Sequence, residues 1–360
     1  MIFFRSDASS IIGTGHVMRC LTLAKALRKL RKKCQFICRD NKGNLIDKIR
    51  HEGFDVRVIL NSKRIKLKKN SDNSNLIHAN WLKTSWQVDA KETIKLLNND
   101  KVDLLVIDHY GIDIKWEEKL RLKSDKIMVI DDLADRNHDC DILLDQNLVK
   151  NYKTRYENLL PKKCISLLGP EYALLQPEYQ RLHKSTKPRI GEIKRILIFF
   201  GGSDQNNLTG LVLSIFLKLN RPDISVDIVI DLKSRYAKEV KLMTNQHSNI
   251  TLYNDLPSLA FLMQKADLSI GAGGSTTWER CCLGLPAIIV VTGLNQKKIA
   301  EAMKSNGVAI TLKPNINLEN DIKKALRFFM RDKNICSQMS KKAFSICDGK
   351  GINRVIKKLI

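Results

Sequence analysis

The chain has 360 residues, 43% of them hydrophobic, which is long enough for two domains because single cores usually stop growing at roughly 250–300 residues. No stretch approaches the ~20 continuous apolar residues of a membrane span, and the first residues lack a signal-peptide pattern. We therefore expect a cytoplasmic protein with no stable membrane insertion. Lysine and arginine outnumber aspartate and glutamate by 62 to 38, a net charge of +24, which favours phosphate-bearing partners.

That charge is spread mostly as lysines, and the single dense cluster, residues 62–70, is predicted to be a solvated loop. No RNA-binding signature with interleaved aromatic and basic residues is present, so we expect no nucleic-acid partner, although a basic nucleic-acid-binding protein stays as the distant alternative. The nine cysteines include no Cys-x-x-Cys pair. They are predicted to be small core residues in a reducing compartment, with no zinc site.

In the first part of the chain, short apolar runs alternate with amphipathic segments. Near-continuous hydrophobic strands separated by helices favour a parallel sheet covered on both faces. The predicted strands are residues 1–7, 33–40, 54–60, 102–110 and 126–135, with helices at 17–31, 45–51 and 89–98.

Four prolines then interrupt the pattern between residues 160 and 192, which predicts a connection. The alternation restarts afterwards. Strands are predicted at 194–204, 225–231, 249–255, 266–276 and 286–291, with helices at 208–219, at 257–264 and from 317 onward. The sequence thus predicts an α/β protein with two Rossmann-like domains, 1–160 and 191–360, joined by a connection at 161–190. Ligands of such sheets bind at the carboxyl ends of strands, and we expect the site in a cleft between the domains.

Three glycine-rich turns each follow a predicted strand. A glycine turn that opens a helix lets backbone N–H groups approach a phosphate closely. Glycine also makes ordinary tight turns, but three such turns in one chain favour an anionic ligand. The turns contain Gly13 and Gly15, Gly201 and Gly202, and Gly273 and Gly274 followed by Ser275 and Glu279. No metal-ligand grouping accompanies them, so we expect neither a metal nor another cofactor.

His16 is the best candidate for a general base, because the start of a helix favours the uncharged ring that a base requires. Asp108, His109 and Tyr110 close another strand and form a second acid–base candidate. The imidazole or the substrate is expected to be oriented by Asp7 or by a hydroxyl of Ser9 or Ser10; a purely structural His16 is the competing interpretation.

Motifs in the same order over nearly the whole chain resemble those of one family. They are "FRSDASSIIGTGHVMRCLTLA", "CRDNKGNLIDKI", "HANWLKTSWQVDAKET", "VIDHYGID", "IDDLADRNHDCDILLDQN", "LLGPEYALLQPEY", "IFFGGSDQNNLT" and "IGAGGSTTWERCCLGLPAIIVVTGLNQ". The family is the UDP-2,4-diacetamido-2,4,6-trideoxy-β-L-altropyranose hydrolases of pseudaminic acid biosynthesis. Lys83 and Trp86 depart from it, since the family usually has Gly and Gln there.

The resemblance implies a GT-B-like fold, a base at His16 and a UDP site in the second domain. It assigns ligand contacts to the turn Gly271–Ser275, to Glu279 and to the pair Asn295 and Gln296. The reaction implied is attack of water on the anomeric carbon with inversion, releasing UDP and the free sugar for flagellin glycosylation or surface polysaccharide. The alternatives are a GT-B glycosyltransferase using a UDP-sugar donor and a hydrolase of a related UDP-diacetamido sugar.

Overall fold

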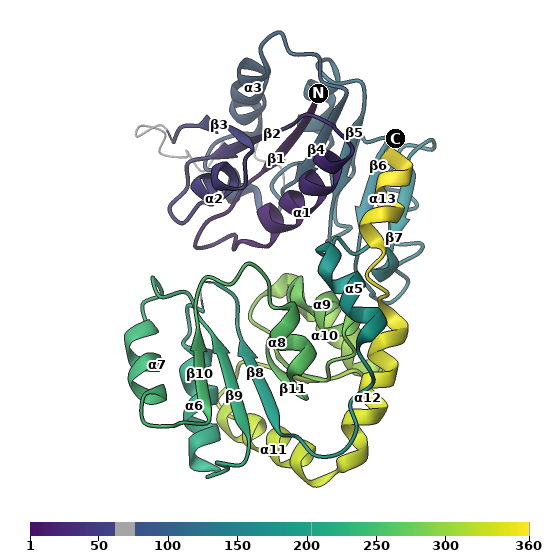
Figure 1. Cartoon of the computed structure of the whole chain (residues 1–360). Coiled ribbons are helices and arrows are strands. Elements are labelled where there is room, and N and C mark those ends of the chain that lie inside the picture. The colour runs from purple at the N-terminus through teal and green to yellow at the C-terminus, as the bar shows by residue number, and fades with distance from the viewer. Residues whose placement is uncertain (62–75, 203, 360) are drawn as a thin grey trace. The chain divides into compact units, whose positions relative to one another are not determined.

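The computed structural model describes residues 1–61, 76–202 and 204–359 (Figure 1). The basic cluster singled out at 62–70 lies outside these residues. The described residues form two compact units. Unit 1 comprises 1–147, 151–174 and 352–360, and unit 2 comprises 148–150 and 175–351. The sequence-based boundaries at 160 and 191 stay a prediction. In the structure the main change from unit 1 to unit 2 falls between residues 174 and 175, and the chain belongs to unit 1 again from residue 352.

Unit 1 contains a sheet whose strands are all parallel, in the order β3-β2-β1-β4-β5-β6-β7. The strands are β1 (Ile2–Ser6), β2 (Cys34–Arg39), β3 (Asp55–Ile59), β4 (Leu104–Asp108), β5 (Ile127–Ile130), β6 (Ile142–Asp145) and β7 (Ile165–Leu168). The helices are α1 (Gly15–Lys29), α2 (Ile46–His51), α3 (Trp86–Leu97), α4 (Ile114–Arg121) and α13 (Gly351–Leu359), with short 3-10 turns η1 (Ala79–Leu82) and η2 (Pro170–Tyr172).

Successive strand residues face opposite sides of this sheet and so build two cores. Phe4 and Val106 pack with α1, α2 and α13 on one face. Phe3 and Leu105 pack with α3 and α4 on the other. Helices therefore cover both faces, as the continuous apolar strands predict, and the carboxyl edge of the sheet is left to the loops.

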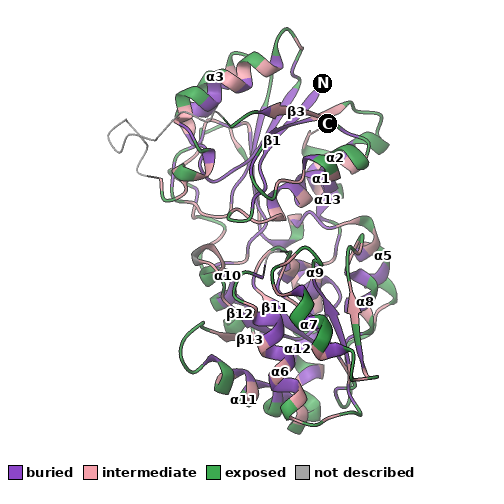
Figure 2. Ribbon diagram, turned by 90° about the vertical axis from the view of Figure 1, so that its left-hand side faces the viewer, coloured by how far each residue is buried: buried purple, intermediate pink, exposed green. Residues whose placement is uncertain are grey.

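Unit 2 repeats the plan with the strand order β10-β9-β8-β11-β12-β13, again all parallel. Its strands are β8 (Arg195–Phe199), β9 (Ser225–Val229), β10 (Ile250–Tyr253), β11 (Leu268–Ala272), β12 (Ala287–Val290) and β13 (Ala309–Leu312). Its helices are α5 (Pro177–Ser185), α6 (Leu208–Lys218), α7 (Ala237–Thr244), α8 (Ala260–Lys265), α9 (Thr276–Cys282), α10 (Leu294–Ser305), α11 (Leu318–Arg331) and α12 (Lys333–Ile346). Figure 2 shows the central strands of each sheet buried and the outward sides of the helices exposed, while the edge strands are partly exposed.

The predicted α/β class with two Rossmann-like sheets is confirmed. The strands β6, β7 and β13 were not predicted. β7 and β13 are partly exposed strands at the edges of their sheets, so they lack the continuous buried run that marks the central strands. All nine cysteines lie within the described residues and are free thiols. In the same part of the chain, no helix is long and apolar enough to cross a membrane.

Candidate functional site

His16 sits at the carboxyl edge of the unit 1 sheet, in the first turn of α1. The loop that leads to it, residues 7–14, is held by its own backbone and by Ser9. The Ser9 hydroxyl accepts hydrogen bonds from the N–H groups of Ile11 (3.1 Å) and Ile12 (2.9 Å). Gly13 donates its N–H to the Ser9 carbonyl at 2.8 Å with φ +82°, a conformation that suits glycine. Ser9 thus shapes this loop, whereas the imidazole is oriented by another residue.

The partner of His16 is Asp108, the last residue of β4. Its Oδ1 lies 2.6 Å from Nδ1 of His16, and Arg19 holds the same carboxylate through Nε (2.6 Å) and Nη2 (2.7 Å). Asp108 is fully buried, and His16 and Arg19 are 7% and 6% exposed. Burial opposes ionisation of Asp108, but the charge of Arg19 and the contact with His16 outweigh it and hold the pKa of Asp108 well below its usual range.

An ionised carboxylate only accepts hydrogen bonds, so Nδ1 of His16 carries the proton of this contact. In the neutral ring, Nε2 is then the nitrogen with a lone pair. This arrangement fixes the tautomer that a general base needs, with Asp108 as the orienting group. Sequence analysis placed Asp108 in a separate acid–base candidate and looked for the orienting group in Asp7, Ser9 or Ser10.

A further set of buried side chains holds Arg19 in place. Its Nη1 donates to Asp132 Oδ2 at 2.8 Å, and Tyr110 donates its hydroxyl to the same oxygen. Asn147 bridges Asp132 (2.6 Å) and Asp145 (2.7 Å) through its Nδ2. Burial, with the charge of Asp132 nearby, raises the pKa of Asp145 to about 7. Hydrogen bonds therefore run from the imidazole to the end of β6.

Aromatic rings stand beside the imidazole. The rings of His16 and Tyr110 meet edge to face with centroids 4.5 Å apart, and Tyr110 stacks on Trp81 of η1 at 5.3 Å. His78 packs against Trp81 at 4.4 Å. Tyr110 was predicted as a supporting residue and does contact His16, whereas Trp81 was missed because nothing in its local sequence separates it from a core aromatic.

Asp7 and His109, also predicted to support the base, belong to a different cluster. Asp7 Oδ1 accepts from Arg5 Nη1 and from the N–H of Arg39, both at 2.7 Å. His109 turns its Nε2 toward Asp7 Oδ2 at 3.4 Å and accepts the N–H of Gly111 at its Nδ1. Burial lowers the pKa of His109, so its ring is neutral. Asp7 therefore contacts His109, Arg5 and Arg39 in the buried interior of unit 1.

In unit 2, the predicted ligand-contact residues lie on the loops after the neighbouring strands β8, β11 and β12. Gly201, at φ +94°, and Gly202 follow β8. The carboxylate of Asp204 accepts the N–H groups of Leu208 and Thr209, both at 2.9 Å, and Asn207 accepts that of Gly210 at 3.2 Å. The first amides of α6 are thus already capped by the chain itself.

The turn between β11 and α9 differs in that, among the described residues, no side chain caps the first amides of α9. A Cβ built on Gly274 would meet no atom within 4 Å, whereas one on Gly271 would lie 2.0 Å from the carbonyl oxygen of Phe199. Gly271 therefore serves the close approach of β8 and β11, and Gly274 leaves open space at the turn. Gln296 closes the turn from the side, since its Oε1 accepts the N–H groups of Gly273 (3.3 Å) and Thr292 (3.1 Å).

The remaining predicted contacts flank this turn. Ser275 is exposed immediately before α9, and Asn295 lies in the first turn of α10. Glu279 is on α9, where burial raises its pKa to about 7 despite a hydrogen bond with Tyr179. Over the described residues, no cluster of three His, Cys, Asp or Glu side chains is arranged to hold a metal ion.

Two parallel sheets, each with helices, and glycine turns at their carboxyl edges define a fold of the GT-B class, in agreement with solved structures. MurG of Acinetobacter baumannii aligns over 99% of this chain and 98% of its own, with a TM-score of 0.66 and 13% identity. The rhamnosyltransferase SpnG complexed with thymidine diphosphate aligns over 99% of both chains, with a TM-score of 0.61 and 15% identity. At these identities the likeness concerns the fold.

Sequence comparisons give more specific relatives. Residues 196–358 match the model of the glycosyltransferase family 28 C-terminal domain. The UDP-2,4-diacetamido-2,4,6-trideoxy-beta-L-altropyranose hydrolase of Campylobacter jejuni is 29% identical over 87% of this chain and 99% of its own length. The uncharacterized protein MJ1062 of Methanocaldococcus jannaschii is 28% identical over 79% of this chain, which spans only 54% of that protein. The spore coat polysaccharide biosynthesis protein SpsG of Bacillus subtilis is 22% identical over 68% of this chain. The resemblance that the motifs indicate is thus confirmed.

Proposed function

We propose that this protein hydrolyses a UDP-linked sugar to UDP and the free sugar, with His16 as the general base. The observation that carries the proposal is the pair of His16 and the ionised Asp108, which fixes the proton on Nδ1 and leaves Nε2 to accept one. A general base in hydrogen-bond reach of water contributes roughly 10²–10⁴-fold to a rate. The sequence similarity to the Campylobacter jejuni hydrolase supports the reaction class.

In the proposed reaction, Nε2 of His16 takes a proton from water as the water oxygen bonds to the anomeric carbon. The bond from that carbon to the phosphate oxygen breaks, and its electron pair leaves with UDP. Attack opposite the leaving group inverts the anomeric centre. Asp108 stabilises the imidazolium that forms, and Arg19 holds Asp108 in its place through two hydrogen bonds.

Unit 2 is proposed to hold UDP. The turn after β11 is proposed to offer the backbone N–H groups of Gly274 and Ser275 to a phosphate, since that of Gly273 is taken by Gln296, and Glu279 is proposed to accept from the ribose hydroxyls. The capping of α6 by Asp204 favours this turn over Gly201 and Gly202 as the main diphosphate contact. The match of residues 196–358 to a glycosyltransferase C-terminal domain supports a nucleotide-sugar ligand here.

The substrate proposed is UDP-2,4-diacetamido-2,4,6-trideoxy-β-L-altropyranose, by similarity to the Campylobacter jejuni enzyme, which places the reaction in pseudaminic acid biosynthesis. The test is hydrolysis of that substrate in heavy-oxygen water, followed by mass analysis. Label in the free sugar and not in UDP is expected, because the carbon–oxygen bond breaks. Label in UDP, or no UDP release from this or a related UDP-diacetamido sugar, would refute the proposal.

A glycosyltransferase using a UDP-sugar donor is the second candidate. The matched glycosyltransferase family 28 domain and the likeness to MurG favour it. The two candidates differ in the absence of an acceptor, where a hydrolase releases UDP at its full rate and a transferase releases little. Addition of candidate acceptors should leave UDP release unchanged if the protein is a hydrolase.

A further inference from the structure

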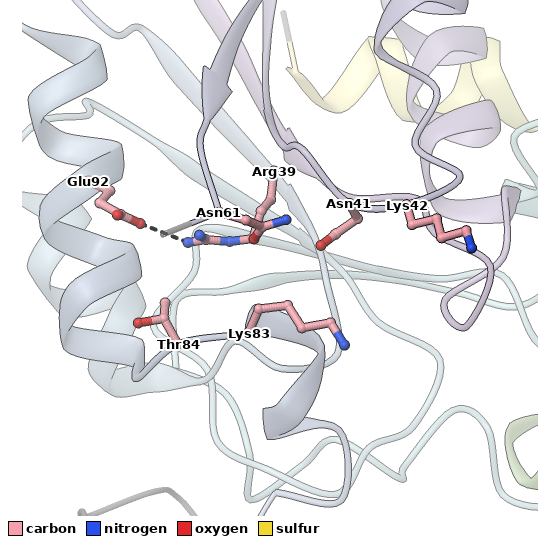
Figure 3. Close-up of a pocket in the computed structure, with 7 residues that line it drawn as sticks. All are labelled: Arg39, Asn41, Lys42, Asn61, Lys83, Thr84 and Glu92. Atoms are coloured by element: carbon pink, nitrogen blue, oxygen red, sulfur yellow. Dashed lines mark hydrogen bonds and ion pairs between the residues drawn. The ribbon is translucent and has the colours of Figure 1, made fainter. Parts of the chain in front are cut away.

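Unit 1 contains a second polar feature, a pocket of about 220 Å³ above the carboxyl ends of β2 and β3 (Figure 3). Arg39, Asn41 and Lys42 line it from the end of β2 and the loop after it, and Lys83 and Thr84 from the loop between η1 and α3. None of its lining residues belongs to the cluster around His16. The mechanism proposed above leaves this pocket unused.

Buried polar atoms in the pocket lack partners. Asn41 is only 3% exposed, yet neither Nδ2 nor Oδ1 of its amide has a hydrogen-bond partner among the residues that the structure describes. Within the same residues, the hydroxyl of Thr84 (7% exposed) and Nε of Arg39 are also buried without a partner. A buried polar group left unpaired destabilises the folded protein, so several in one pocket point to a ligand that satisfies them.

Lys83 provides a second, independent observation. It has φ +59°, the left-handed conformation that favours glycine, and a non-glycine residue held there is strained. Its exposed side chain reaches into the space beneath the Asn41 amide in the view of Figure 3. The positively charged side chain of Lys83 is therefore placed at this pocket by a residue whose backbone conformation favours glycine.

The balance of groups identifies the ligand chemistry. The donors in the lining are the guanidinium Nε of Arg39, the Asn41 amide and the ammonium of Lys83, while Lys42 adds positive charge with a side chain that extends away from them in Figure 3. The carboxylate of Glu92 is the charged acceptor in the lining, and Nη2 of Arg39 already donates to it at 2.8 Å. Donors and positive charge are thus in excess, which suits a ligand rich in acceptors and negatively charged.

We propose that this pocket is a binding site for a small anion, a carboxylate or a phosphate monoester, separate from the UDP site. The amide of Asn41 and the ammonium of Lys83 are its principal contacts. The residues proposed to hold UDP all belong to unit 2, whereas every residue that lines this pocket belongs to unit 1.

The test is calorimetric titration of the full chain, saturated with UDP, with three probes in turn: orthophosphate, succinate and the neutral sugar N-acetylglucosamine. We expect one of the two anions to bind at one site per chain and the neutral sugar not to bind. The anion that binds distinguishes phosphate from carboxylate recognition. Asn41→Leu and Lys83→Gly should each weaken binding about tenfold or more, since each removes a hydrogen bond to a charged group.

Lys83→Gly also relieves the left-handed backbone, so its melting temperature should not fall, which separates loss of binding from loss of folding. Lys91→Gln is the matched control, because Lys91 is an exposed lysine of α3 outside the pocket and its replacement removes the same charge. The proposal is overturned if neither anion binds, if the neutral sugar binds as well as the anions, or if Lys91→Gln weakens binding as much as Lys83→Gly. The same titrations repeated without UDP test this pocket even if UDP proves not to be a ligand.

Discussion

Replacement of Asp108 by Asn probes the central contact of the proposed site. The carboxylate is fully buried and accepts from Nδ1 of His16 at 2.6 Å and from two nitrogens of Arg19 at 2.6 and 2.7 Å. An amide of the same shape can turn its NH₂ toward Nδ1. The ring then carries its proton on Nε2 and can no longer accept one from water.

The expected loss in kcat is about 10³–10⁴-fold, the size seen when the orienting carboxylate of a serine-protease triad becomes an amide. It corresponds to roughly 4–5.5 kcal/mol of transition-state stabilisation. The free energy of unfolding should fall by less than the roughly 3–5 kcal/mol of a fully broken buried ion pair, because Arg19 keeps its contacts with Asp132. Affinity for UDP should not change, since its proposed contacts are in unit 2.

The assay follows UDP release from the diacetamido substrate at saturation, with UDP affinity measured by calorimetry. Glu117→Gln is the matched control, because Glu117 and His138 form another fully buried carboxylate–imidazole pair in unit 1, with Oε1 and Nδ1 2.7 Å apart. That variant should lose stability and keep its kcat. A kcat for Asp108→Asn within about tenfold of the wild-type value, or an equal loss in Glu117→Gln, would refute the role given to Asp108.

Three further outcomes are expected. His16→Ala should lower kcat by roughly 10²–10⁴-fold with UDP affinity intact, and wild-type turnover in that variant would exclude the proposed base. Gly271→Ala should cost roughly 2 kcal/mol or more in denaturant unfolding, because its methyl group would lie 2.0 Å from a backbone oxygen of β8. Gly274→Ala, in open space, should stay within about 0.5 kcal/mol of the wild type, and equal losses in the two variants would contradict this. Burial raises the pKa of Asp145 to about 7 from an unfolded value near 3.9, so the folded state binds the extra proton between these values. Its stabilisation is fully present below pH ~4 and lost as the pH rises through 7, so Asp145→Asn should gain stability relative to the wild type from pH 5 to pH 8, by at most about 2.7 kcal/mol for the two pH units between 5 and 7. Unfolding at the two pH values checks this, and an unchanged difference would show that the Asp145 carboxyl is not perturbed.

The fold was largely predictable from the sequence, because its longer strands are apolar throughout and its helices show one apolar face. Strands such as Ile2–Ser6 and Leu104–Asp108 are buried along their whole length, which is what a parallel sheet covered on both faces requires. The edge strand β7 is half exposed and lies between Pro161 and Pro170 in a region expected to be a connection. Its place depends on pairing with β6, which is a tertiary contact that local pattern does not encode.

The site was less predictable than the fold. His16 stands out because of its glycine turn, but its partner Asp108 is 92 residues away in the sequence and becomes adjacent only because β1 and β4 pair. Asp7 was an equally reasonable partner on sequence proximity, and the structure gives it to Arg5 and Arg39 instead. Trp81 likewise reaches the imidazole through a turn that pattern alone does not position.

The chain passes from unit 1 to unit 2 and then returns to unit 1, which matters when the two units are to be expressed separately. Helix α13 inserts Ile352 and Val355 into the core beneath β1 and β4, so unit 1 is assembled from both extremes of the polypeptide. A gene fragment that stops after residue 174 would encode that unit with an uncovered apolar groove, and we expect it to aggregate. A circular permutant that joins 352–360 to Met1 through a glycine-serine linker would make the first half a continuous stretch, suitable for expression on its own.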